Sequence, residues 1–457
     1  MKDMTRGSIV RHLLGLAVPI AIGMLFQMLY VMVDLYFVAG LGDAAVAGLV
    51  TAGNIQFVVL ALTQVLGAGA MALIAQAVGG GDQADAALVF NQSLLIACVC
   101  AVLTLAIGYG GADFYMRSVA ADDATRVAGT TYLHWFLPGM ALQFALVAMG
   151  SALRGTGIAR PGMIVQVSTV ALNALLAPVF VAGWLTHRPM GIAGAGLASS
   201  ISIAVGVAMM TLYFARREKY IRFDAISCMP DAATWKRILR IGLPPGGEFV
   251  ILFVFLAVIY AVIRPFGAAA QAGFGIGSRL NQAIFLPAMA VAFSVAPLAG
   301  QNFGARRLDR VRETFRAAAI IGSSIMIALT LLCQWKPEWL MHAFTSDPAV
   351  VAIGSGYLLI SSWNFVAQCI IFSCSGMFQA FGRTLPSLYA STARLVVFAI
   401  PVLWLSRRAG FELDDVWHLV LTTVTAQMCI SVFLLKRALQ REQSMLVPSR
   451  GHRWVRA

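Results

Sequence analysis

The chain has 457 residues, of which 60% are hydrophobic and only 12% are charged, and its mean hydropathy is +0.81. A composition this apolar lies outside the range of soluble domains, so the sequence predicts a membrane protein and argues against a soluble enzyme. We attribute the formal net charge of +13 to membrane topology and to contact with anionic lipids, and we expect no nucleic-acid partner.

Twelve apolar stretches are long enough to cross a bilayer as helices. A spanning helix needs about 20 mostly apolar residues, because the hydrocarbon core is about 30 Å thick and each residue rises about 1.5 Å. The stretches are continuously apolar, which favours helices over a barrel and predicts an all-α polytopic membrane protein. In chain order the predicted spans are 12–40, 49–79, 88–109, 131–153, 161–183, 191–214, 237–264, 274–300, 314–335, 354–378, 387–407 and 416–437.

The first predicted span contains a carboxylate. Asp34 lies about six residues, or roughly 9 Å, from the outer end of that helix. Gln27, Tyr30 and Asp34 are spaced three and four residues apart, so they share one helix face. A carboxyl group removed from water favours its neutral form, and we therefore predict that Asp34 takes up and releases a proton. The alternative is a permanent hydrogen-bonded contact between helices.

Two polar residues later in the first half are candidate partners of that carboxylate. Asn173 lies in the fifth predicted span and Ser199 in the sixth. Either residue can instead serve helix packing alone, Asn173 through an interhelical hydrogen bond and Ser199 as part of a run of small residues.

A charged segment follows the sixth span and divides the chain. We predict an N-terminal six-helix lobe over residues 1–215, a cytoplasmic linker over 216–236, and a C-terminal six-helix lobe with a basic cytoplasmic tail over 237–457. The linker would give one lobe enough slack to rock against the other, as in many duplicated carriers.

The second half carries three further charged residues well inside its spans, away from their ends. Glu248 follows Pro244 and Pro245 near the middle of the seventh span, and the prolines are expected to break or kink that helix. Glu248 is either a second proton or cation site or a buried structural carboxyl. Arg279 and Arg394 either line a cavity or extend toward the helix ends.

The two halves share an internal repeat, because a single register, in which Pro19 falls on Pro244, aligns most of each half without gaps. Six spans per repeat give both copies the same orientation, so we predict two pseudo-symmetric six-helix bundles with a cavity between them. The register pairs Asp34 with Ile259, so the acidic residues of the two halves are not symmetry mates. Further coinciding pairs include Gln76 and Gln301, Tyr132 and Tyr357, and Gln143 and Gln368.

Basic residues predict the orientation of the chain. If the N-terminus is cytoplasmic, the inward-facing segments hold 24 of the 33 Lys and Arg residues and the outward-facing segments hold 7. The positive-inside rule then places both termini in the cytoplasm, in a multi-pass protein of the cell (inner) membrane.

The two repeats, the linker and the first-span pattern together resemble the multidrug and toxic-compound extrusion (MATE) family over essentially the whole chain. The pattern consists of Pro19, Gln27, Tyr30, Asp34, Phe37, Val38, Gly40, Leu41 and Gly42, and the helix ends at Gln76 and Gln301, followed by Gly79 and Gly304, also fit it. This resemblance implies secondary active multidrug efflux, in which lipophilic and often cationic compounds leave by cation antiport through a cleft between the lobes. It implies neither enzymatic activity nor a cofactor.

The resemblance also implies a site for the coupling ion. Asp34 corresponds to the family's first-helix carboxylate, which binds a proton or Na⁺. Its implied surroundings are Gln27, Tyr30, Tyr132, Asn173 and Ser199.

The coupling ion is predicted to be H⁺ rather than Na⁺. Some relatives carry a second acidic residue one turn after the asparagine, where this chain has Ala177. Acidic positions of the sodium-type branch fall on Leu252 and on the run 373–379, which contains no carboxylate. Fewer charged oxygen ligands disfavour Na⁺, so Asp34 is the main predicted proton carrier and Glu248 a candidate second.

Aromatic residues in the spans are candidate contacts for planar cations, although most such residues face lipid or protein core. They are Phe26, Phe57, Phe255, Phe285 and Trp363. We expect the chain to act as a monomer in the lipid bilayer on small lipophilic cations. Two other functions stay open: a lipid-linked precursor flippase of the same superfamily, which would line its cleft with many basic residues, and a passive channel, which needs no titratable carboxylate.

Overall fold

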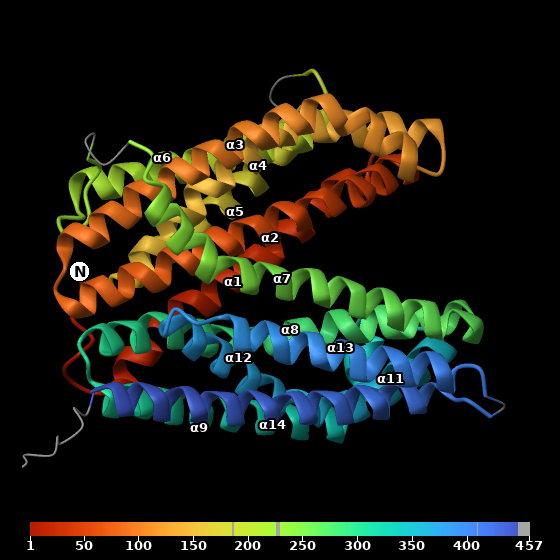
Figure 1. Cartoon of the computed structure of the whole chain (residues 1–457). Helices are drawn as coiled ribbons and strands as arrows, with labels where there is room; N and C mark the ends of the chain where they lie inside the picture. The colour runs from red at the N-terminus through yellow and green to blue at the C-terminus, as the bar shows by residue number, and fades with distance from the viewer. Residues whose placement is uncertain (185–186, 225–228, 409, 447–457) are drawn as a thin grey trace, which may run out of the picture. The chain divides into compact units, whose positions relative to one another are not determined.

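The computed structural model describes residues 1–184, 187–224, 229–408 and 410–446. Residues 225–228 of the predicted linker, including Cys228, lie outside these ranges. The predicted basic tail from residue 447 onward also lies outside them. The described residues form helices and contain no strand (Figure 1).

The helices follow the predicted spans closely. The first half contains α1 (Ile9–Ala39), α2 (Asp43–Gly80), α3 (Gln83–Val119), α4 (Asp123–Gly155), α5 (Arg160–Val181) and α6 (Ile192–Arg216). The second half contains α7 (Ala232–Ile263), the 3-10 turn η2 (Arg264–Phe266), α8 (Ala268–Gly304), α9 (Leu308–Trp335), α10 (Pro337–His342), α11 (Pro348–Ser362), α12 (Asn364–Ala380), α13 (Leu385–Leu405) and α14 (Leu413–Leu446).

Eleven of these helices are individually long and apolar enough to cross a membrane. The twelfth span is the pair α11 and α12, which bends by 54° at Trp363. The prediction of twelve membrane spans in an all-α protein is therefore confirmed for the part of the chain that the structure describes. In the seventh span α7 continues through Pro244 and Pro245, so the helix is not broken there, and the predicted kink stays a prediction.

The contacts of the chain fall into two compact units. Unit 1 contains Met1–Asp3 and Leu14–Val250, and unit 2 contains Met4–Leu13 together with the described part of Ile251–Ala457. The division falls inside α7, whose first part contacts α2 closely: a methyl group at Gly242 would lie within 2 Å of the carbonyl oxygen of Val65. The lobe boundaries predicted at residues 215 and 236 were drawn from the sequence and not from contacts, and they stay predictions.

The backbone repeats in the register that the sequence predicts. Gly42 and Gly267, which precede α2 and α8, have φ angles of 102° and 91°. Gly81 has a φ of 77°, and its counterpart Arg306 keeps a positive φ of 57° although it carries a side chain. A non-glycine residue rarely adopts such a φ, so its presence at the matched position shows that the fold determines this conformation.

A close crossing of two helices also repeats. In unit 1 a methyl group at Gly48 of α2 would lie 2.8 Å from the backbone nitrogen of Gly129 of α4. In unit 2 the matched pair, Gly273 of α8 and Gly354 of α11, stands in the same relation at 3.1 Å. Small residues let membrane helices approach this closely. Van der Waals packing then holds the helices together, because lipid provides no hydrophobic driving force between them.

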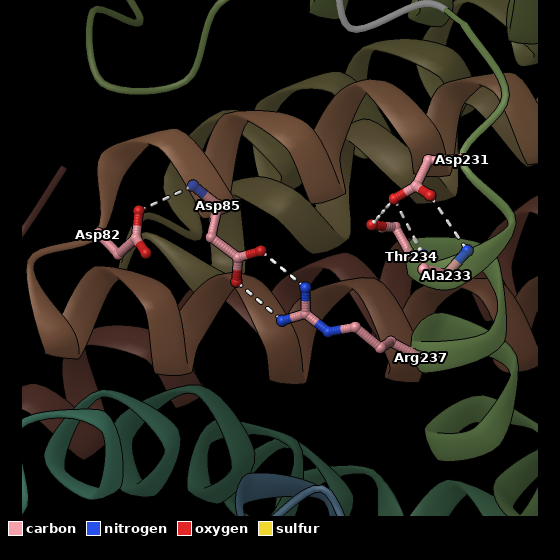
Figure 2. A network of polar contacts seen from close by, with 6 residues as sticks. All are labelled: Asp82, Asp85, Asp231, Ala233, Thr234 and Arg237. Atoms are coloured by element: carbon pink, nitrogen blue, oxygen red, sulfur yellow. Dashed lines mark hydrogen bonds and ion pairs between the residues drawn. The ribbon is translucent and has the colours of Figure 1, made fainter.

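The start of α7 is fixed in unit 1 by charged residues. Asp231 caps the helix, accepting hydrogen bonds from the backbone N–H groups of Ala233 and Thr234, each at 3.1 Å (Figure 2). One turn later Arg237 donates to both carboxylate oxygens of Asp85 on α3, at 2.7 and 2.8 Å. Both side chains of this ion pair are partly exposed, so it orients α7 against α3 more than it stabilises the fold.

Candidate functional site

A buried polar cluster surrounds Asp34 in unit 1. Asp34 is only 6% exposed on the otherwise apolar α1. The amide nitrogen of Asn173, on α5, donates to its Oδ1 at 3.1 Å, and the hydroxyl of Ser199, on α6, donates to its Oδ2 at 3.0 Å. The Asn173 amide also donates to the Ser199 hydroxyl at 3.0 Å. Three helices therefore converge on one carboxyl group, and the structure brings these three predicted residues together.

Two tyrosines complete the cluster. The Tyr30 hydroxyl lies beside Asp34, Asn173 and Ser199, one turn before Asp34 on α1. Tyr132 of α4 is buried next to Tyr30 and Asp34, and its ring packs against Phe136 at 5.3 Å between centroids. The described groups around the carboxyl, from Tyr30, Tyr132, Asn173 and Ser199, are uncharged.

Two buried oxygen atoms of the cluster have no hydrogen bond of good geometry. The Tyr30 hydroxyl and the Oδ1 atom of Asn173 are buried and make no hydrogen bond to any residue that the structure describes. Buried polar atoms are normally satisfied, so unsatisfied ones next to a carboxylate indicate a place for water, a hydronium ion or a cation. Asp34 supplies the single acidic group of this arrangement.

Two other predicted site residues are not among the described hydrogen-bond partners of Asp34. Gln27 is exposed on α1 and makes none of the hydrogen bonds to Asp34. Glu248 is partly buried on α7, in the part of that helix that belongs to unit 1. The hydrogen bonds of Asp34 go to Asn173 and Ser199 instead.

The five aromatic candidates are not gathered into one described pocket. Phe57 and Trp363 are 46% and 63% exposed, and Phe26 is partly exposed on α1. Phe285 packs on Phe365 at 5.0 Å between ring centroids, within the core of unit 2. Phe255 is buried and lies under a guanidinium group.

The equivalent place in unit 2 is apolar. In the register of the repeat, the counterparts of Tyr30, Asp34, Asn173 and Ser199 are Phe255, Ile259, Phe398 and Val424, and all four are buried. The rings of Phe255 and Phe398 contact each other at 4.6 Å between centroids. The polar cluster is therefore a property of the first repeat alone.

The sequence singled out Arg394 near this apolar place but not the amide side chains beside it. The guanidinium carbon of Arg394 on α13 lies 4.3 Å from the centre of the Phe255 ring, and its Nη1 donates to Gln427 of α14 at 3.3 Å. Asn281 of α8 donates to the Tyr357 hydroxyl at 2.8 Å. The signal available in the sequence was an amide side chain inside an otherwise apolar span, at Gln427 and at Asn281.

The MatE family model matches residues 19–179 and, a second time, residues 244–405, which together make up well over half of the chain. The chain belongs to the MatE family. The two matches begin at Pro19 and at Pro244, which coincide in the register that aligns the halves of the sequence. Membership of the MatE family confirms the predicted resemblance and, with the helices described above, the fold of two six-helix repeats.

Individual relatives of this MatE protein cover nearly its whole length. A probable multidrug resistance protein of Bacillus subtilis is 27% identical over 406 residues, which is 87% of this chain and 88% of that protein. An FAD transporter of Shewanella oneidensis is 24% identical over 439 residues, which is 94% of this chain and 95% of that protein. A crystal structure of a MATE protein in the bent conformation matches with a TM-score of 0.91 at 22% identity, over 97% of this chain and 98% of that one. This MatE chain is thus a multi-pass membrane transporter and not an enzyme.

Proposed function

We propose that this MatE transporter exports lipophilic, often cationic compounds and exchanges them for protons carried by Asp34. The observation that carries the proposal is the buried carboxyl group of Asp34, whose hydrogen-bond partners among the described residues, Asn173 and Ser199, are uncharged. Several kinds of support agree: the family of the chain, the name of its Bacillus subtilis relative, and the chemistry of the cluster.

Burial without a cationic partner makes the protonation state of Asp34 depend on access to water. An ionised carboxylate in an apolar surrounding is costly, so closing the site favours the neutral acid, and opening it to water favours release of the proton. The cluster thus couples proton movement to a change of access, as a proton antiporter requires.

Proton coupling is preferred over Na⁺ coupling because the cluster has few charged oxygens. One turn after Asn173 on α5 stands Ala177, and Asp34 is the one acidic residue whose hydrogen bonds tie it to Asn173 and Ser199. Hard cations prefer several oxygen ligands with strong negative charge. The buried oxygens of Tyr30 and Asn173 would suit a hydronium ion or water as well as Na⁺, so the ion must be tested directly.

Substrate efflux under imposed gradients tests the proposal. Purified protein in liposomes should transport ethidium when a pH gradient is applied and not when a Na⁺ gradient is applied. Asp34→Asn should reduce gradient-driven transport to background, whereas the control Asp43→Asn, at an exposed carboxylate at the start of α2, should not. Transport by Asp34→Asn at the wild-type rate would refute the coupling role, and transport driven by Na⁺ alone would refute the choice of ion.

We further propose that the chain lies in the inner membrane with both ends in the cytoplasm and works as a monomer. The excess of basic residues in the inward-facing segments supports this orientation. Alkaline phosphatase fused after the last residue should be inactive, and an active fusion would contradict the orientation.

A flippase for lipid-linked precursors is less well supported. Away from their ends, the predicted spans hold two arginines, Arg279 and Arg394, against the acidic residues Asp34 and Glu248, so the net charge there is zero. A cleft for a pyrophosphate headgroup would be expected to carry an excess of positive charge.

A further inference from the structure

Arg394 lies in the middle of a membrane span of unit 2. It stands nine residues after the first residue of α13 and eleven before the last. At about 1.5 Å per residue, either helix end is more than about 13 Å away. Its side chain is partly buried and points toward neighbouring helices of its own unit, where it contacts Phe255 of α7 and Gln427 of α14.

The positive charge of Arg394 has no acidic partner among the described residues. Its guanidinium carbon lies 4.3 Å from the centre of the Phe255 ring, and Nη1 donates to Gln427 Oε1 at 3.3 Å. The N–H group at Nε is buried and makes no hydrogen bond to a described residue. A guanidinium group has five N–H donors in a rigid fork, so most of its capacity is unused.

Neighbouring side chains hold Arg394 in place without neutralising it. Gln427, which accepts from Arg394, itself donates to the Ser391 hydroxyl at 3.1 Å. The Tyr357 hydroxyl lies near the guanidinium group and accepts from Asn281 at 2.8 Å. The arrangement therefore presents positively polarised donors next to an aromatic ring.

The repeat shows that this arrangement is specific to the second half. The counterpart of Arg394 in unit 1 is Thr169, and the counterpart of Asp34 in unit 2 is Ile259. One unit thus holds a buried acid without an arginine, and the other holds an arginine without a buried acid at the matched place. A buried cation that only served packing would be replaced at lower free-energy cost by an apolar side chain.

We propose that Arg394 binds the carboxylate group of a compound that this protein carries. The planar fork matches the two oxygens of a carboxylate, and the packing of the guanidinium group on the buried Phe255 ring holds that fork in place. The inference rests on the proposed function in one respect, that the bound compound is transported. Binding of the compound to Arg394 can be measured without measuring transport.

A matched pair of ligands isolates the carboxylate. Norfloxacin carries an aryl carboxylate, and its methyl ester lacks the negative charge and adds one methyl group. Binding to the purified full-length protein in phosphatidylcholine nanodiscs should be at least about tenfold tighter for the acid than for the ester. The proposal is overturned if the wild-type protein binds the acid no better than the ester, or binds neither.

Substitutions assign the preference to one residue. Arg394→Gln should bind the acid and the ester equally, and Arg394→Lys, which keeps the charge and loses the fork, should retain a reduced preference. Arg279→Gln is the control, because Arg279 also lies in a span but is exposed on α8, and it should keep the wild-type preference. Persistence of the preference in Arg394→Gln, or its equal loss in Arg279→Gln, overturns the assignment. If Arg394→Gln does not give monodisperse protein, an undiminished preference in Arg394→Lys has the same consequence.

A lipid headgroup is the competing source of an oxyanion. Nanodiscs that also contain phosphatidylglycerol should leave the preference for norfloxacin over its ester unchanged, whereas loss of the preference there would assign the site to lipid phosphate instead. Wild-type export of ethidium, which has no carboxylate, tests the proposed function independently of this site.

Discussion

Ser199 is the neighbour of Asp34 that can serve both protonation states of the carboxyl group. Its hydroxyl donates to Oδ2 at 3.0 Å when Asp34 is ionised. A hydroxyl also has acceptor lone pairs, so after a rotation it can accept the hydrogen of the neutral acid, which the amide nitrogen of Asn173 cannot do. Proton exchange at Asp34 therefore need not leave a buried group without a partner.

Ser199→Ala is expected to slow proton-driven ethidium efflux about tenfold. A hydrogen bond to a charged group contributes about 1.5 to 3 kcal/mol, and its loss would affect the ionised state of Asp34 more than the neutral one. Ser199→Thr keeps the hydroxyl and should retain most of the rate. The control is Ser202→Ala, because Ser202 is also buried on α6 but donates within its own helix, to Ala198 at 2.8 Å. Equal slowing in this control would contradict the specific role of Ser199.

At the level of helices, the crossing of α2 and α4 depends on the absence of side chains. A methyl group at Gly48 would lie 2.8 Å from the Gly129 nitrogen and 2.9 Å from the Ala128 side chain. Backbone atoms cannot move away as a flexible side chain can, so the two helices would have to separate. Asn173 and Ser199 reach Asp34 from other helices of the same unit, so the packing of unit 1 also positions the cluster.

Gly48→Ala is expected to destabilise the protein by about 1 to 3 kcal/mol, as overpacking in a filled core does. The measurement is the melting temperature of the purified protein, followed by size-exclusion chromatography after heating. Gly53→Ala, also within α2 but with no atom near the added methyl, should leave the melting temperature unchanged or raise it slightly. A melting temperature of Gly48→Ala equal to that of Gly53→Ala would contradict the close crossing.

The cap of α7 gives a prediction for acid pH. The hydroxyl of Thr234 and the backbone N–H of Ala233 donate to Asp231 and lower the pKa of that carboxyl below its usual value of 3.8. A carboxyl whose pKa is lower in the folded state adds stability above its unfolded pKa, and that stability is lost as the pH falls through the folded pKa. Asp231→Asn keeps a capping side chain that does not titrate. As the pH is lowered from about 5 to about 2, the wild-type melting temperature should therefore drop more than that of Asp231→Asn, and parallel curves would contradict this role.

At the level of the whole chain, duplication produced two repeats with the same backbone and different chemistry. Matched backbone angles and helix crossings persist in the register of the repeat, whereas the acid of one repeat and the arginine of the other are not shared. An efflux carrier that takes up a proton at one place and a substrate at another is consistent with such specialised halves.

Apolar runs and the repeat were sufficient to predict the helices, because each membrane span must satisfy its own backbone. Helix ends were less predictable: α3 extends to Val119 beyond the predicted residue 109, where Asp113 forms ion pairs with Arg117 and Arg126 outside the apolar run. The bend at Trp363 had no local signal such as proline or glycine.

The candidate site was predictable only where residues share a helix or a family pattern. Spacing and resemblance named Asp34, Asn173 and Ser199, and the structure brings them into contact. Spacing also grouped Gln27 with Asp34, but the Gln27 side chain is exposed. The stacking of Arg394 on Phe255 depends on how α7 and α13 pack, which no pattern within either helix encodes.

The most direct test of the central claim is a count of protons moved per molecule of ethidium. Liposomes containing the purified protein and an internal pH-sensitive dye would report loss of an imposed pH gradient when ethidium is added. The account predicts ethidium-dependent proton flux with the wild-type protein and none with Asp34→Asn, although that variant still binds ethidium. Proton flux through Asp34→Asn at the wild-type ratio would contradict the account.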